Sequence, residues 1–371
     1  MRVTRLRLRD FRSYASAELA LGAGMTVVQG RNGAGKTNLL EALHLACTGP
    51  SVRTASEREA IRFGASVARV ELRAEAPDGA HEISVGLRAG EPRRLRVDGV
   101  LVERLAEVEV RPLAGVFSPD RLELVKGGPA LRRAHLDQVV AALWPARSEN
   151  RRRYARALAQ RNALLGRLRA GAGGRDALGA WDAELAARGI ALMADRREAV
   201  ALLACRFGPT AAAIGLDGDP EVSYRPRSRA VSAEELATEL GDRLGADVER
   251  GFTGHGPHRD DLGLTREGRD MRSYGSQGQQ RLGLLALLLA EREAIGEARG
   301  APPLMLLDDA VSELDVERRG ALVDVLRAAG GQSVLTTTDL DAVPGARDPE
   351  VARVTVSGGA VLEATGDRAA A

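Results

Sequence analysis

A glycine-rich segment near the amino end of the chain, GRNGAGKT from Gly30 to Thr37, constrains the fold more than any other feature. It follows the apolar run Met25–Gln29 and precedes Lys36–Cys47, where apolar residues recur with helical spacing. A strand, a G-x-x-x-x-G-K-[ST] turn and a helix in this order predict a P-loop, in which backbone N–H groups and a helix N-terminus surround phosphates. A glycine-rich turn that ends in Lys-Thr by chance is the simpler alternative, because the chain has 42 glycines.

The residues of this segment have distinct expected roles toward a nucleoside triphosphate. The Lys36 ammonium would reach the β- and γ-phosphates, and the Thr37 hydroxyl would be a ligand of Mg²⁺. The only other lysine is Lys126, and an arginine would be too bulky for the role of Lys36. The residues expected to bind the nucleotide here are Gly30, Arg31, Asn32, Gly33, Ala34, Gly35, Lys36, Thr37 and Asn38.

A second segment, PPLMLLDDAVSELD from Pro302 to Asp315, is an apolar strand that ends in two carboxylates. In P-loop proteins such a strand end lies at the Mg²⁺-phosphate site. We expect Asp308 to hold Mg²⁺ through water and Asp309 to polarise the attacking water as general base. The candidate catalytic residues are therefore Lys36, Asp308 and Asp309. Two acidic residues that cap a surface strand are the alternative.

A third segment, SYGSQGQQRLGLLALLLAERE from Ser273 to Glu293, places a short polar turn directly before a long apolar helix. Ser276, with Gln277 and Gly278, would form a second phosphate-facing helix N-terminus. Because one ATP needs only one P-loop, this turn predicts that ATP is shared, with Ser276 approaching the γ-phosphate bound to another copy of the chain. An ordinary capped helix is the alternative.

These three segments, in this order, resemble the ATP-binding cassette family and, along nearly the whole chain, its RecF branch. The resemblance implies an α/β fold, an ATP-binding cassette ATPase head with a mixed β-sheet and an α-helical lobe, that uses ATP and Mg²⁺. It also implies an ATP-induced homodimer that binds double-stranded DNA at gaps or junctions in replication and recombinational repair, with RecR and RecO as partners in recombinase loading. Residues Ser312–Asp315 would contact the other subunit across the nucleotide. The supporting segments are Leu8–Tyr14, Gly30–Leu43, Leu124–Asp137, Gly256–Leu262, Tyr274–Arg281, Asp308–Asp315 and Thr336–Asp341.

The chain departs from the broader cassette family at three points. Thr338 and Asp339 stand where many members have a histidine, as the RecF resemblance leads one to expect. No glutamine occurs in residues 30–137, where a cassette protein would have one in the loop that links its lobes. We place this linking loop at Phe117–Asp120. Asp309 occupies a position that is glutamate in many cassette ATPases, which predicts weak hydrolysis that acts as a switch. The resemblance implies that DNA stimulates this hydrolysis.

The order of predicted elements divides the chain into a head and an inserted lobe. The first hundred residues are rich in strands and include three segments expected to form an antiparallel meander: Val67–Ala74, His81–Arg88 and Arg93–Val97. From Pro129 to Phe207 the apolar spacing is helical, and a break at Gly171–Gly174 predicts an antiparallel helical hairpin. We therefore predict a split head, 1–115 and 255–371, around a mostly helical lobe, 116–254.

Composition argues against several other classes of protein. No apolar run approaches the length that crosses a bilayer, and the amino-terminal residues lack the apolar segment of a secretory signal, so we expect a cytoplasmic protein. Cys47 and Cys205 lie in apolar stretches without metal-ligand spacing and are expected to be buried. The formal net charge of +2 does not by itself indicate nucleic-acid binding.

A DNA-binding surface must therefore come from local clusters of basic residues. Arginines on one exposed helix face would neutralise phosphates without reading sequence, and duplex DNA is favoured because only 3% of residues are aromatic. A solvated face whose arginines pair with nearby acids is the alternative. One cluster is Arg147, Arg151, Arg152, Arg153, Arg156 and Arg161, a second is Lys126, Arg132 and Arg133, and the DNA-binding candidates are Arg151, Arg152, Arg156 and Lys126.

Two other classes of ATPase share parts of this pattern. A chromosome-organising or break-repair ATPase of the SMC kind shares the head, but it needs hundreds of residues of heptad helix between the halves, and the insert here is far too short. The ATPase subunit of a membrane transporter would have a contiguous head and a conventional histidine. Stimulation of ATP turnover by duplex DNA without lipid would distinguish the expected protein from a transporter subunit.

Overall fold

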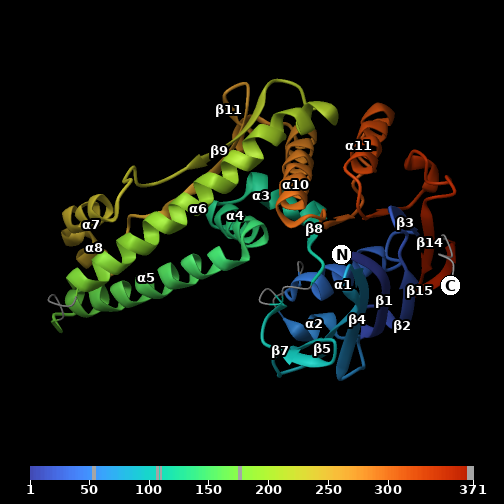
Figure 1. Ribbon diagram of the computed structural model, residues 1–371, viewed down its shortest axis with the longest axis horizontal. Helices are drawn as coiled ribbons and strands as arrows, with labels where there is room; N and C mark the ends of the chain where they lie inside the picture. Colours follow the sequence, from blue (N-terminus) through green and yellow to red (C-terminus); the bar gives the residue numbers. More distant parts are fainter. Residues whose placement is uncertain (52–55, 106–107, 109–110, 174–177, 366–371) are drawn as a thin grey trace. The chain divides into compact units, whose positions relative to one another are not determined.

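The computed structural model describes residues 1–51, 56–105, 108, 111–173 and 178–365, which divide into two compact units (Figure 1). The first, which we call the sheet unit, comprises the described residues of Met1–Leu122, Thr210–Asp217 and Gln277–Ala371. The second, the helical unit, comprises those of Glu123–Pro209 and Gly218–Ser276. Each unit is therefore assembled from segments that are far apart in the sequence.

Two six-stranded sheets enclose helix α1 (Lys36–Thr48) in the sheet unit. The antiparallel sheet has the order β2-β1-β4-β5-β6-β7, and the mixed sheet has the order β15-β14-β3-β13-β12-β8, with β15 antiparallel to β14 and the other pairs parallel. Side chains such as Leu6, Val28 and Leu43 share one buried core, which spans both sheets and the helix. The strands are β1 (Arg2–Phe11), β2 (Tyr14–Ala20), β3 (Met25–Gln29), β4 (Val67–Ala76), β5 (Gly79–Arg88), β6 (Arg94–Val97), β7 (Val100–Val102), β8 (Ala114–Phe117), β12 (Leu304–Leu307), β13 (Ser333–Thr337), β14 (Ala352–Ser357) and β15 (Ala360–Thr365).

The two longer remaining helices of the sheet unit, α10 and α11, lie before and after β12 in the sequence. Helix α10 (Gln277–Arg299) contacts β8, and all four residues of β12 are buried, as parallel strands covered on both faces require. Helix α11 (Val316–Ala328) begins at Asp315, whose carboxylate accepts a hydrogen bond from the Arg318 N–H at 2.8 Å. The short helices are α2 (Glu57–Ala60), η2 (Pro119–Leu122) and η6 (Leu340–Ala342).

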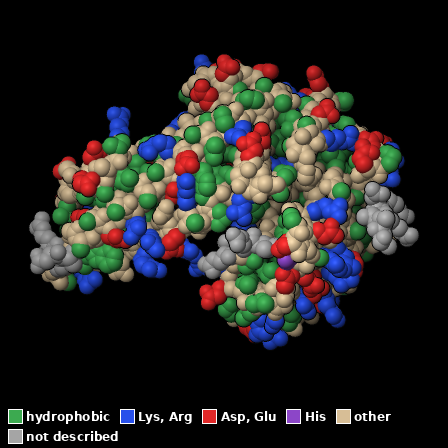
Figure 2. Space-filling model, in the orientation of Figure 1, with side chains coloured by type: hydrophobic (Ala, Val, Ile, Leu, Met, Phe, Trp, Pro, Cys, Tyr) green, Lys and Arg blue, Asp and Glu red, His purple; other side chains and the backbone are tan. Residues whose placement is uncertain are grey.

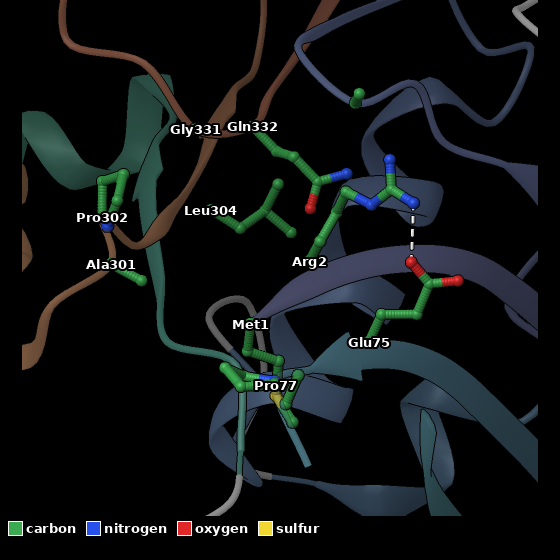
Figure 3. A pocket seen from close by; sticks show the side chains of 11 residues that line it. Met1, Arg2, Glu75, Pro77, Ala301, Pro302, Leu304, Gly331 and Gln332 are labelled. Carbon is green, nitrogen blue, oxygen red and sulfur yellow. Dashed lines mark hydrogen bonds and ion pairs between the residues drawn. The ribbon is translucent and has the colours of Figure 1, made fainter. Parts of the chain in front are cut away.

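One buried amide ties the amino ends of the parallel strands to the antiparallel sheet. Gln332 accepts a hydrogen bond from the Val3 N–H at 2.6 Å and donates to the carbonyl oxygens of Val3 and Gly22, both at 2.7 Å. Beside it lies a cavity of about 390 Å³, in which Arg2 and Glu75 form an ion pair at 2.6 Å (Figure 3). The P-loop follows the opposite, carboxyl end of β3, so this cavity is separate from the predicted site.

Long antiparallel helices dominate the helical unit, as the sequence predicts. Helices α5 (Ser148–Arg169) and α6 (Leu178–Ala213) run side by side in opposite directions, with Arg161 paired to Asp182 at 2.6 Å (Figure 1). The break between them includes Gly174, which lies outside the described residues. The other elements are α3 (Glu123–Lys126), α4 (Pro129–Leu143), η3 (Pro145–Arg147), α7 (Ala233–Asp242), α8 (Leu244–Arg250), η5 (Pro257–Arg259), α9 (Met271–Tyr274) and the antiparallel strands β9 (Pro220–Arg225), β10 (Asp261–Arg266) and β11 (Arg269–Asp270).

The compact units differ at their edges from the predicted head and lobe. Residues 255–276, expected in the head, lie in the helical unit because β10 pairs with β9 and Asp261 pairs with Arg132 at 2.7 Å. Residues 210–217, expected in the lobe, lie in the sheet unit. The chain passes from one unit to the other after Leu122, close to the predicted linking loop.

Most predicted elements are confirmed, and two details are wrong. The predicted meander forms β4, β5 and β6, paired antiparallel. Cys47 is buried, but Cys205 is exposed because it lies on a solvent-facing side of α6. Phe117 is not a loop residue: it is 1% exposed and ends β8, since the parallel pairing with β12 extends to it. Within the described residues, no helix is both long and apolar enough to span a membrane.

Candidate functional site

The predicted P-loop joins β3 to α1 at the carboxyl edge of the mixed sheet (Figure 1). Gly33 and Gly35 have φ values of 77° and 114°, in the left-handed region that favours glycine. A β-carbon at Gly30 would lie 2.5 Å from the Val356 carbonyl oxygen, and one at Gly35 would lie 2.7 Å from the Tyr14 hydroxyl. Backbone conformation or close packing therefore requires glycine at Gly30, Gly33 and Gly35. A turn that is rich in glycine by chance would not have this requirement at each position.

The Lys36 side chain folds over this loop. Lys36 is 8% exposed, and its Nζ donates hydrogen bonds to the carbonyl oxygens of Gly30 at 2.7 Å and Arg31 at 3.2 Å. Burial lowers the pKa of the Lys36 ammonium, while the carboxylates of Asp309 and Asp308 act in the opposite direction. An ammonium carries three donors, so the third can reach a phosphate oxygen between the loop and the two carboxylates.

Two hydroxyl groups hold Asp308 at the end of β12. Thr37 Oγ1 donates to Asp308 Oδ2 at 2.8 Å, and Thr336 Oγ1 donates to Asp308 Oδ1 at 2.7 Å. These residues meet because β3, β13 and β12 are parallel neighbours whose carboxyl ends form one edge. In the sequence Thr336 is marked only as the first residue of Thr336–Asp341, a segment of the family resemblance, and no role is predicted for it. Its place at the end of the apolar strand that follows the LLDD segment is the signal that could have found it.

The pair Thr37 and Asp308 fits a magnesium ion. Mg²⁺ prefers oxygen ligands, keeps several waters and is usually bound through one or two protein groups together with substrate phosphates. The hydroxyl and the carboxylate supply such oxygens 2.8 Å apart. Among the described residues, no group of three or more His, Cys, Asp or Glu side chains is placed to hold a metal ion. In such a site, phosphate and water would supply the other ligands.

Asp309 has an unusual backbone conformation that the structure enforces from both sides. Its φ of 52° is positive, which costs a residue other than glycine on the order of 1–3 kcal/mol. Its N–H donates to Thr336 Oγ1 at 2.9 Å, and its carbonyl oxygen accepts from Arg281 Nη2 at 2.7 Å. Such a conformation persists where the surrounding structure determines it, as these two hydrogen bonds do here.

The turn between β1 and β2 supports the P-loop from the antiparallel sheet. The Tyr14 hydroxyl donates to the Gly35 carbonyl oxygen at 3.0 Å, and Asn38 Nδ2 donates to Ser13 Oγ at 2.9 Å. Tyr14 is completely buried. In the sequence this turn is noticeable only through the family resemblance, since its distance from the P-loop along the chain gives no sign of contact.

The predicted second phosphate-facing turn is exposed at the start of α10. Ser276, Gln277 and Gly278 are all exposed, whereas most of the helix behind them is buried. Ser276 is the last residue of the helical unit and Gln277 resumes the sheet unit. The structure therefore groups the P-loop with Asp308 and Asp309, and leaves this turn open to solvent.

The predicted DNA-binding residues are exposed to different degrees, and several are paired with acids. Arg151 forms an ion pair with Asp137 at 3.1 Å, and Arg152 forms one with Glu149 at 2.7 Å. Arg156 is exposed, and Lys126 is half-buried at the end of α3. Figure 2 shows basic and acidic side chains interspersed on the visible surface, without a large patch of one sign.

Two members of the predicted basic clusters do not lie on an exposed face. Arg161 is completely buried, because it pairs with Asp182 at 2.6 Å and with Asp247 at 2.8 Å inside the helical unit. Arg132 is 6% exposed and binds the carboxylate of Asp261 through two nitrogens, at 2.7 and 2.9 Å. Both arginines hold the unit together, and neither is available to a DNA phosphate.

The mixed sheet, its P-loop and the grouped residues define a P-loop nucleotide-binding protein. Comparison with known proteins narrows this class to a family. Residues 2–358 match the model of the RecF/RecN/SMC N terminal domain. The chain is 41% identical to the DNA replication and repair protein RecF of Myxococcus xanthus (strain DK1622), covering 97% of both chains, and 38% identical to that of Heliobacterium modesticaldum (strain ATCC 51547 / Ice1), covering 92% of this chain and 94% of the relative. The chain therefore belongs to the RecF family of DNA replication and repair proteins.

Solved structures show the same relationship at the level of the fold. The recombination mediator protein RecF-ATP of the RecFOR pathway superposes with a TM-score of 0.86 at 27% identity, over 98% of both chains. An Smc head bound to the C-winged helix domain of ScpA superposes with a TM-score of 0.60 at 15% identity, over 99% of this chain and 98% of that one. The second likeness shows a shared fold alone.

Proposed function

We propose that this chain binds ATP and Mg²⁺, dimerises around the nucleotide and binds duplex DNA in recombinational repair. One observation carries the nucleotide site: Thr37 and Asp308, from distant parts of the sequence, share a hydrogen bond of 2.8 Å beside the buried Lys36. A chance glycine-rich turn and a surface strand capped by acids would not meet in this way. The related RecF-ATP structure supports the choice of ATP.

The phosphates would lie against residues 30–38, with the nucleoside in the cavity next to the first turn of α1. That cavity has a volume of about 820 Å³ and is lined by Ser13 and Asn38, among others. Its size is in the range of small-molecule sites. Mg²⁺ at Thr37 and Asp308 would neutralise phosphate charge. The Lys36 ammonium would bind the γ-phosphate and Asp309 would accept the proton of the attacking water.

Hydrolysis in this site would be weak and stimulated by DNA. An aspartate at position 309 is one methylene shorter than the glutamate of many cassette ATPases, so its carboxylate reaches less far toward a bound water. Its backbone is fixed on both sides, so it cannot move freely to compensate. Slow hydrolysis suits a switch in which ATP closes the dimer and turnover opens it.

Three further groups of residues support the remainder of the proposal. Ser276, Gln277 and Gly278 would contact the γ-phosphate held by a second copy, and residues Ser312–Asp315 would contact that copy across the nucleotide. Arg151, Arg152, Arg156 and Lys126 would contact the phosphates of duplex DNA. RecR and RecO are the proposed protein partners, on the strength of the family and of the RecFOR pathway in which the related structure is placed.

Sedimentation with two complementary variants tests whether ATP is shared. Lys36→Ala removes the phosphate cation, and Ser276→Arg blocks the exposed turn, so neither variant alone should dimerise with ATP. A mixture of the two should regain the dimer mass, because one site of the mixed dimer combines an intact P-loop with an intact Ser276. Ser16→Arg, on the exposed part of β2, is the matched control and should dimerise normally. If the mixture stays monomeric, or if Ser276→Arg dimerises alone, ATP is not held between two copies.

A further inference from the structure

Arg281, on the first turns of α10, makes contacts that the proposed function does not use. Its side chain is 8% exposed, its Nη2 donates to the Asp309 carbonyl oxygen at 2.7 Å and its Nη1 pairs with Glu313 at 2.8 Å. The guanidinium carbon also lies 5.2 Å from the centroid of the Phe117 ring. One side chain therefore joins the start of α10, the loop after β12 and the end of β8, all within the sheet unit.

The bond to Asp309 completes a clamp on a strained peptide. Thr336 holds the N–H of Asp309 and Arg281 holds its carbonyl oxygen, while φ stays at 52°. The planar guanidinium can bind a carbonyl and a carboxylate at once in fixed directions, which a lysine ammonium does not reproduce. The direction of the Asp309 carboxylate therefore depends on where Arg281 lies.

The surroundings of Arg281 indicate more than a surface ion pair. Its Nε is buried and has no hydrogen-bond partner within the described part of the chain. A buried donor left without a partner is costly, and a solvated arginine would avoid that cost. Glu313, by contrast, is 68% exposed, in the segment proposed to contact a second copy. Arg281 thus connects an exposed contact segment to the half-buried peptide of Asp309.

We propose that Arg281 is a positioning residue that sets the direction of the Asp309 carboxylate according to the position of the α10 turn. This inference rests on the proposed function, in which Ser276 engages the nucleotide of a second copy and Asp309 is the general base. When the turn engages that copy, Arg281 moves with the helix and carries the Asp309 peptide with it. Arg281 acts through Asp309 and does not touch the nucleotide itself.

Steady-state turnover of Arg281→Met and Arg281→Lys, at saturating ATP and duplex DNA, tests this role. Arg281→Met should lower kcat roughly tenfold to a hundredfold, as misplacing a reacting group by about 1 Å does. The affinity for ATP should change less than about threefold, and the ATP-dependent dimer mass should be kept. Arg281→Lys should recover part of kcat, because its ammonium can still donate to the Asp309 carbonyl.

Arg327→Met is the matched control, since Arg327 also joins a carbonyl, that of Gly345, to a carboxylate, that of Asp348, elsewhere in the sheet unit. Its kcat should equal that of the unmodified chain. The inference is overturned if Arg281→Met leaves kcat unchanged while the unmodified chain turns over ATP, or if kcat and ATP affinity fall together in proportion to a lower Tm. An unmodified chain without ATP-dependent dimerisation and turnover overturns the proposed function, and this inference with it.

Discussion

At the residue scale, one hydroxyl group organises the acidic end of β12. Thr336 Oγ1 donates to the carboxylate of Asp308 and accepts from the N–H of Asp309, so a single side chain holds one carboxylate and the neighbouring peptide. Valine has nearly the same shape but offers no hydrogen bond. Thr336→Val should therefore lower kcat for ATP while ATP affinity changes less, and should destabilise the sheet unit by about 1–3 kcal/mol, because buried polar groups lose their partner.

Thr355→Val, on β14, is the control for this substitution and should change neither quantity measurably. Turnover and urea unfolding of the three proteins would be compared at one pH. Equal kcat for Thr336→Val and the unmodified chain would show that the hydroxyl does not position the carboxylates.

Also at the residue scale, the buried imidazole of His44 makes stability depend on pH. Burial, with Arg121 nearby, lowers the pKa of His44 from 6.5 to about 4. Between these values the unfolded chain binds more protons at His44 than the folded chain does. The contribution of the neutral His44 to the free energy of unfolding is therefore full above pH 6.5 and is lost as the pH falls toward 4. Between pH 7.5 and 5.5 the loss should be about 1.4 kcal/mol.

Urea unfolding of the chain and of His44→Gln at these two pH values measures that contribution. The stability that is lost on acidification should be smaller in the variant than in the unmodified chain, by about 1.4 kcal/mol. His258, in the helical unit, also has its pKa lowered to about 4 by burial, so the pH dependence that persists in the variant should come partly from the other unit. Identical pH profiles for the two proteins would contradict a buried neutral His44.

At the scale of elements, buried ion pairs fasten the helices of the helical unit. Arg161 of α5 joins Asp182 of α6 and Asp247 of α8, and the Arg161 and Asp247 side chains are 0% and 1% exposed. Arg161→Met should leave the Asp247 charge buried without its partner and destabilise the unit by about 3–5 kcal/mol. Arg156→Met, on the exposed side of the same helix, should change stability by less than about 0.5 kcal/mol. Urea unfolding of the two variants, monitored by the circular dichroism signal of the helices, measures these changes. Equal unfolding midpoints for the two variants would contradict the role of Arg161.

The same elements show what the sequence could and could not predict. Strands β3 and β12 follow from short continuous apolar runs, which fit strands buried on both faces. The meander and the α5–α6 hairpin follow from apolar periodicity, because each of them buries a face that its own residues define. Arg161 was expected on an exposed face, since periodicity reports apolar residues and cannot show that an arginine points inward to a partner 86 residues away. Thr336 and Arg281 lie in segments of the family resemblance, but the sequence predicts no role for either of them. Their partners belong to other elements, and only the sheet order brings them together.

At the scale of the whole molecule, the proposed nucleotide site and the proposed DNA-binding residues belong to different units. Every residue of the grouped site, from Lys36 to Asp309, belongs to the sheet unit, whereas the candidate DNA-binding residues belong to the helical unit. The exposed turn of Ser276 and Gln277 lies where the chain passes from one unit to the other. The proposed nucleotide site and the proposed DNA-binding residues can therefore be altered by substitutions in separate units of the chain.

Duplex DNA binding, measured with ATP over a range of salt concentrations, tests the whole-molecule proposal. Each phosphate neutralised by the protein steepens the dependence of log affinity on log salt by about 0.9, so Arg156→Ala should reduce the slope by roughly that amount on duplexes of any sequence. Arg151→Ala should reduce the slope by a smaller amount, because Arg151 already forms an ion pair with Asp137. Arg94→Ala, at an exposed position of β6 in the sheet unit, is the matched control and should leave the slope unchanged. If the control and Arg156→Ala reduce the slope equally, DNA is held by general surface charge and α5 is not its binding face.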